Sequence, residues 1–218
     1  MSAASPQAPS PQAPSPHAPD APAPAPQTPT RAKKPSARER LLAAADELFY
    51  AEGVHTVGID RVIERAGVAK ASLYSCFGSK DELVRAYLEG RHAIRRSRLM
   101  AGLERYDDPR DRLLGVFDVL AELAGAAGFR GCAFYNASAE SGPGGPVEEV
   151  SLANRAWTRG LFTELARDAG ARDPIGLAEQ LMILYDGAMV SSRMDQRAEG
   201  ALVARGIAGS LLAAAVAV

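Results

Sequence analysis

The sequence has few of the residues that form disulfides, metal sites and catalytic centres. Its two cysteines, Cys76 and Cys132, are too few for a disulfide framework or a ligand cluster, which fits a reducing compartment. Beyond the N-terminal tail the only histidines are His55 and His92, and no Ser-His-Asp or metal-ligand spacing occurs. We therefore expect no catalytic residues, no metal and no cofactor.

Long apolar runs are also scarce. The longest is the C-terminal LLAAAVAV, well below the roughly 20 residues that span a bilayer. The N-terminus lacks the apolar stretch that an export signal requires. These absences predict a cytoplasmic protein without a membrane partner.

Proline is nearly confined to the N-terminus, where 11 of the 15 prolines precede Ser36. The first 30 residues are almost entirely Pro, Ala, Ser and Gln, and SPQAP recurs there. Such a segment cannot maintain helix or sheet hydrogen bonds and has little apolar surface to bury. We expect a disordered tail over residues 1–35. It ends in a basic arm that joins the first helix, with five basic residues against Glu39: Arg31, Lys33, Lys34, Arg38 and Arg40.

From Ser36 onward the apolar residues recur at helical spacing, and no stretch alternates as a strand does. Ser36–Glu39 and Ser79–Glu82 both have the pattern of a capping box at a helix start. The sequence predicts an all-α fold. The expected helices run from Ser36 to Gly53, 59–66, 70–77, from Ser79, from Asp108, 131–140, from about Val150 to Gly170, from Asp173, and 198–217.

The stretch AGVAKASLYSCFGSKDEL, residues 66–83, predicts a helix-turn-helix. Gly67 lies in a tight turn between two helices, and Leu73 and Phe77 can pack on the helices before it. The remaining side chains of the short helix face outward. The second helix of such a motif enters the DNA major groove, while neighbouring elements contact phosphates. Candidate contacts to bases are Lys70, Ala71, Ser72 and Ser75, and candidate contacts to phosphates are Tyr74 and Lys80.

The same residues resemble a known family. RERLLAAADELFYAEGV followed by IDRVIERAGVAKASLYSCFGSKDEL is similar to the DNA-binding domain of the TetR/AcrR family of bacterial transcriptional regulators. The resemblance covers about fifty residues. Three positions depart from the family pattern. Ala69 stands where the family has a capping Ser, and Cys76 stands where it has His or Tyr. Val57-Gly58 stands where the family often has a Thr at the start of the second helix, a role that the neighbouring Thr56 could take. Arg38 in the basic arm and Thr56 complete the candidate DNA contacts.

The resemblance implies a homodimeric repressor of a double-stranded DNA operator, in which a small molecule binds a larger C-terminal domain. We expect three parts: the tail (1–35), the helix-turn-helix domain (36–82) and a ligand-binding and dimerisation domain (83–218). The last two long helices would form the dimer interface. An apolar or aromatic effector is expected. Its candidate lining residues are Phe117, Leu120, Phe134, Tyr135, Trp157, Leu161, Met182, Tyr185 and Met189, with Asn136 and Asp186 as polar groups that could orient it.

Two other classes of function are considered. A nonspecific or architectural DNA-binding protein is usually strongly basic, whereas this chain has a formal net charge of −1 and a large apolar helical region. An enzyme acting in the C-terminal pocket would need an acid-base pair, and the sequence suggests none. The regulator is the favoured interpretation.

Overall fold

The computed structural model describes residues 34–216, and residues 35–216 lie in one compact unit. The expected tail, with Arg31 and Lys33 of the basic arm, lies outside the described residues. So do residues 217 and 218 at the C-terminus. Lys34, the last residue of the basic arm before Pro35, is exposed.

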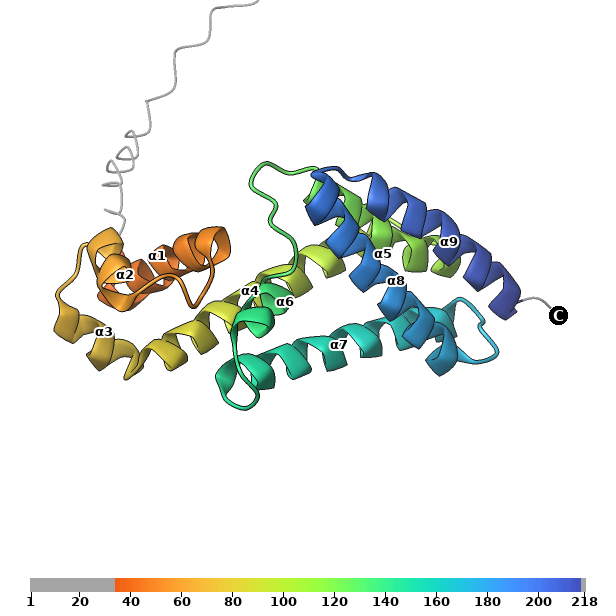
Figure 1. Cartoon of the computed structure of the whole chain (residues 1–218). Coiled ribbons are helices and arrows are strands. Elements are labelled where there is room, and N and C mark those ends of the chain that lie inside the picture. Colours follow the sequence, from red (N-terminus) through yellow and green to blue (C-terminus); the bar gives the residue numbers. More distant parts are fainter. Residues whose placement is uncertain (1–33, 217–218) are drawn as a thin grey trace, which may run out of the picture. The chain divides into compact units, whose positions relative to one another are not determined.

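Residues 34–216 contain nine helices and no strand, which confirms the all-α prediction for this part of the chain (Figure 1). The helices are α1 (Ala37–Glu52), α2 (Ile59–Ala66), α3 (Lys70–Phe77), α4 (Lys80–Leu103), α5 (Pro109–Ala124), α6 (Ala133–Glu140), α7 (Pro146–Asp168), α8 (Pro174–Asp195) and α9 (Glu199–Val216).

Four of the helices, α1, α4, α5 and α8, start at capping residues of the sequence. Ser36 and Glu39 form the full capping box of α1, and Asp108 accepts hydrogen bonds from two backbone amides at the start of α5. Ser79 caps α4 by accepting from the Glu82 amide. The Glu82 carboxylate instead binds Arg85, so this capping box is only half formed. Helix α7 begins at Pro146, before the expected Val150, because proline suits the first helical position.

Two apolar cores lie within the unit. The first is built from α1, α2, α3 and the first two turns of α4, and it also includes Ala133, Phe134 and Ala137 of α6 and Val150 of α7. The second joins the end of α4 to α5, α7, α8 and α9. The first core thus draws on residues from both sides of the boundary expected at residue 82. That boundary stays a prediction.

Within residues 34–216, α9 is long and apolar enough to cross a membrane, judged by length and composition alone, with a mean hydropathy of 1.4. The uninterrupted apolar run at the C-terminus is much shorter than α9 and did not predict this length. Helix α9 packs on α5 and α8, and its Arg205 forms an ion pair with Asp118 of α5 at 2.8 Å. These contacts make it a component of the helical bundle.

Gly115 of α5 allows the ring of Tyr106 to lie directly on the helix, where the Tyr106 hydroxyl donates to Asp118 at 3.0 Å. A Cβ at residue 115 would overlap this ring, at 2.8 Å from its Cδ2. Alanine in a helix gains about 1 kcal/mol over glycine, whereas overpacking costs about 1–3 kcal/mol. We expect Gly115→Ala to lower the free energy of unfolding by up to about 2 kcal/mol, measured by urea denaturation.

The matched control is Gly160→Ala in α7, where a Cβ meets no atom within 4 Å. There the helix propensity acts alone, so the free energy of unfolding should rise by up to about 1 kcal/mol. Equal effects of the two substitutions would contradict the role assigned to Gly115.

Candidate functional site

The turn between α2 and α3 is fixed by its backbone and by one arginine. Gly67 ends α2 with φ 60° and ψ 47°, a left-handed conformation that suits glycine. The Arg40 guanidinium of α1 donates to the carbonyl oxygens of Ala66 and Gly67, at 3.2 and 2.8 Å. Arg40 therefore binds the end of α2 and is a structural part of the turn.

Helix α3 is attached to the first core by one face. Leu73 is fully buried, and Val68 and Phe77 pack partly buried against the same core. The opposite face carries the residues predicted to contact DNA: Lys70, Ala71, Tyr74 and Ser75 are exposed and Ser72 is half-buried. The structure thus brings the predicted base contacts together on one face, as the motif requires.

Ion pairs neutralise much of the basic charge beside this face. Lys70 Nζ lies 2.9 Å from Asp60 Oδ1, and this hydrogen bond raises the pKa of Lys70 above its ordinary value. Arg61 pairs with Glu52, and Arg65 pairs with Glu47 at 2.7 Å. Exposed ion pairs of this kind contribute only about 0–1 kcal/mol to stability. A DNA phosphate or the edge of a DNA base can therefore displace the carboxylate.

The other candidate DNA contacts lie around α3. Arg38 is exposed at the start of α1, with its guanidinium 5.0 Å from the centre of the Phe77 ring. Lys80 is half-buried at the first position of α4 and approaches the His55 carbonyl at 3.5 Å. Thr56 is exposed in the loop before α2, whose N-cap is Gly58 without a side-chain hydrogen bond. Thr56 therefore does not supply the cap.

Two of the departures from the family pattern have a structural outcome. Ala69 occupies the N-cap of α3 in an extended conformation and makes no side-chain cap. Cys76 packs half-buried against the first core, as a small packed residue does.

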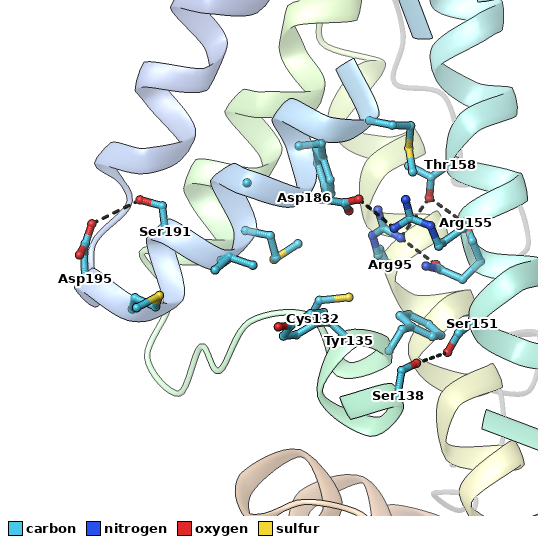
Figure 2. A pocket seen from close by; sticks show the side chains of 18 residues that line it. Arg95, Cys132, Tyr135, Ser138, Ser151, Arg155, Thr158, Asp186, Ser191 and Asp195 are labelled. Carbon is cyan, nitrogen blue, oxygen red and sulfur yellow. Dashed lines mark hydrogen bonds and ion pairs between the residues drawn. The ribbon is translucent and has the colours of Figure 1, made fainter. Parts of the chain in front are cut away.

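A cavity of about 800 Å³ lies among α4, α6, α7 and α8. Figure 2 shows its polar groups, which gather in three places: Arg95, Arg155, Thr158 and Asp186 on one side, Ser138 and Ser151 below, and Ser191 and Asp195 on the other side. A smaller adjoining cavity of about 120 Å³ shares Arg95, Cys132, Phe134, Tyr185 and Met189 with it.

The predicted lining residues divide between cavity and core. The large cavity is lined by Phe134, Tyr135, Met182, Tyr185, Asp186 and Met189, and the small one by Leu120. Four of the predicted residues line neither cavity: Phe117, Asn136, Trp157 and Leu161.

Each of these four has another packing role. Phe117 and Leu161 are buried in the second core. The ring of Phe117 packs against the rings of Phe162 and Tyr185. Trp157 packs against His92 with ring centres 5.6 Å apart. Asn136 donates to the Arg130 carbonyl.

Several polar lining residues were not predicted, and Arg95 is the most important of them. Its guanidinium donates to Asn154 Oδ1 at 2.7 Å and to Thr158 Oγ1 at 3.2 Å. Helical spacing could have indicated it, since Arg95 follows Leu88 by seven residues and precedes Leu99 by four, on the buried face of α4.

Helix α6 contacts both regions. Phe134 lines the cavity and belongs to the first core. The Tyr50 hydroxyl of α1 accepts from the Arg130 amide at 2.9 Å and donates to the Gly131 carbonyl at 3.0 Å. At the other end of α6, Glu140 accepts from the His55 amide at 2.8 Å. A displacement of α6 by a bound molecule would therefore act directly on the helix-turn-helix region.

The fold and the exposed polar face of α3 define the class of a helix-turn-helix DNA-binding transcriptional regulator. Residues 41–87 match the family model described as bacterial regulatory proteins, tetR family. A TetR-family transcriptional regulator from Streptomyces coelicolor is 34% identical and superposes with a TM-score of 0.78, over 83% of this chain and 96% of that one. The chain belongs to the TetR family of transcriptional regulators, a family of regulators rather than enzymes.

Curated relatives include both directions of regulation. The transcriptional activator FasR of Mycolicibacterium smegmatis is 31% identical over 64% of each chain. The transcriptional repressor NemR of Escherichia coli is 30% identical over 66% of each chain. This chain therefore spans less than two thirds of the length of these two relatives.

The uncapped start of α3 gives a test of the local structure. The backbone of Ala69, with φ −73° and ψ 149°, is suited to a capping serine. We expect Ala69→Ser to raise the free energy of unfolding by about 1 kcal/mol, measured by urea denaturation. Ala71→Ser, inside the same helix, provides no cap and should lower it slightly. A loss of stability in Ala69→Ser would show that α3 starts elsewhere.

Proposed function

We propose that the chain is a homodimeric repressor, released from a palindromic operator when a small molecule enters the cavity. The observation that carries this proposal is the position of α6, which lines the cavity and also packs in the core of the helix-turn-helix region. A molecule in the cavity would then change the position of α3 through α6 and through α4.

The proposed DNA contacts follow from the exposed face of α3. Lys70, Ala71, Ser72 and Ser75 would contact base edges, since the first turns of a recognition helix reach into the major groove. Tyr74, Lys80, Arg38 and Thr56 would contact phosphates around the groove. We propose residues 36–82 as the DNA-binding domain and residues 83–218 as the effector and dimerisation domain of a cytoplasmic protein.

The proposed dimer interface is supported by apolar surface on the last two helices. On α8, Ile183 and Met194 are 75% and 77% exposed, and Met194 also lines the cavity. On α9, Leu202, Val203 and Ile207 are also exposed. Apolar patches of this kind mark interfaces, and pairing two helices from each subunit would bury them in a four-helix bundle.

Relatives of this chain include repressors and activators. Because FasR is an activator, activation of transcription is the specific alternative to repression. Effector-induced release from DNA supports a repressor, and effector-induced binding or recruitment of the transcription machinery supports an activator. A nonspecific DNA-binding protein would show neither response and would not discriminate between sequences.

Selection of bound fragments from a random DNA pool tests the DNA-binding proposal. We expect an inverted repeat, because a two-fold dimer presents two α3 helices to half-sites about 34–36 Å apart. Lys80→Ala should flatten the salt dependence of operator affinity by about two counterions per dimer, without changing the preferred sequence.

Arg167→Ala, an exposed arginine at the end of α7, is the control and should leave that slope unchanged. Equal affinity for the selected repeat and for random DNA at moderate salt would refute sequence-specific regulation.

The dimer proposal is tested by Ile183→Asp. A carboxylate on each subunit in an apolar interface is costly to desolvate, so we expect monomers in sedimentation experiments and operator affinity at least about tenfold weaker. Leu152→Asp on α7, where the side chain is also exposed at 59%, is the matched control and should remain dimeric. A dimer that survives Ile183→Asp would place the interface elsewhere.

A further inference from the structure

Arg95 is a half-buried cation in the wall of the cavity, and its hydrogen-bond partners are neutral. Its hydrogen bonds go to the amide oxygen of Asn154 and the hydroxyl of Thr158, both buried side chains of α7. Its guanidinium also lies 5.2 Å from the centre of the Tyr185 ring. Within residues 34–216, no carboxylate forms an ion pair with it, and its Nε is buried without a hydrogen-bond partner.

This arrangement differs from that of the other arginines near the cavity and the first core. Arg155 lines the same cavity but is paired with Asp186 at 2.8 Å, and Arg91 is paired with Asp46 at 2.6 Å. Burial of a charged group is costly unless an opposite charge or a full set of hydrogen bonds compensates for it. Arg95 has neither, so an anion entering the cavity would supply the missing acceptors.

Among the residues that line the large cavity, those around Arg95 leave one net positive charge, and Arg98 lines only the smaller cavity. Arg155 and Asp186 neutralise each other, as Figure 2 shows beside Arg95. The other lining carboxylate, Asp195, lies nine residues after Asp186 on α8, about 13 Å along the helix axis. It accepts a hydrogen bond from Ser191 at the far side of the view. A second negative charge on the ligand would therefore meet Asp186 or Asp195.

The remaining wall of the cavity is largely apolar. Phe134, Met182, Tyr185, Met189 and Val190 line it, and methionine side chains adapt to ligands of varied shape. A ligand that fills the space would gain from burying apolar surface along α8, with its acidic group at Arg95.

We propose that the effector is an organic monoanion, with one carboxylate or comparable acidic group held by Arg95 and an apolar body against α6 and α8. This inference rests on the proposed function, because it assigns the chemistry of the effector. It narrows the apolar or aromatic molecule expected from the sequence to one that carries a single negative charge.

The test uses the full chain and a panel of matched compounds, in which each apolar or aromatic carboxylic acid is paired with its primary amide. Naphthoate with naphthamide and decanoate with decanamide are two such pairs. Calorimetric titration should give affinities at least about tenfold higher for acids than for amides, because hydrogen bonds to an ionised acceptor are the stronger ones. In Arg95→Met acids and amides should bind with about equal affinity.

Arg96→Met is the matched control, since Arg96 is the next residue on α4 and lies over Trp157, away from both cavities. It should keep the preference for acids. Arg95→Lys retains the charge and should keep part of the preference, which makes the test independent of the folding of Arg95→Met. The comparison of acids with amides in the unaltered protein needs no variant.

Three outcomes would overturn the inference: amides that bind as tightly as acids, a preference that survives Arg95→Met, or no binding by any acid of the panel. The proposed function is judged separately, by operator selection. A protein that selects a palindrome and is released from it by neutral compounds alone keeps its proposed function and loses this inference. A protein that selects no palindrome loses the proposed function, even if acids bind at Arg95.

Discussion

The structure depends on one continuous helix that belongs to both cores. Leu83 and Leu88, near the start of α4, are fully buried in the first core, and Leu99 and Leu103 are buried in the second. The helix has 24 residues and is therefore about 36 Å long. Because both ends are held by apolar packing, the position of the recognition helix and the shape of the cavity cannot change independently.

Helix α6 provides a second connection of a different kind. It has eight residues, too few to be stable alone, so its structure depends on the surfaces that it contacts. One set of its residues completes the first core, and another lines the cavity. The Tyr50 hydroxyl of α1 binds the backbone just before α6, and Glu140 at the end of α6 binds the His55 amide. We therefore expect α6 to shift when a molecule occupies the cavity.

The parts of the fold that the sequence predicted are governed by local rules. Ser36, Asp108 and Asp173 cap helices where their side chains can reach the first amides, and Gly67 forms the left-handed turn. The exposed face of α3 was also predictable, because Leu73 and Phe77 fix which side is buried. Hydrophobic periodicity and helix capping depend on residues only a few positions apart, so both can be recognised in the sequence.

The cavity was harder to predict because its walls come from segments far apart in the sequence. Phe117 and Tyr185 have the same apolar character, yet only Tyr185 lines the space, since Phe117 is enclosed by other helices. Arg95 was missed because a basic residue in the basic stretch of α4 resembles a solvated one. Helical spacing places it on the buried face of α4, but its contacts come from α7, a segment far away in the sequence.

The paired charges around α3 also bear on how such a protein finds its site among the many sequences of a chromosome. Binding to arbitrary DNA is almost entirely electrostatic. With Arg61, Arg65 and Lys70 each held by an acid, the protein presents less net positive charge to random duplex than its count of basic residues suggests. We therefore expect its residence on random duplex to be shorter than its count of basic residues suggests, which would leave more of each copy's time for searching.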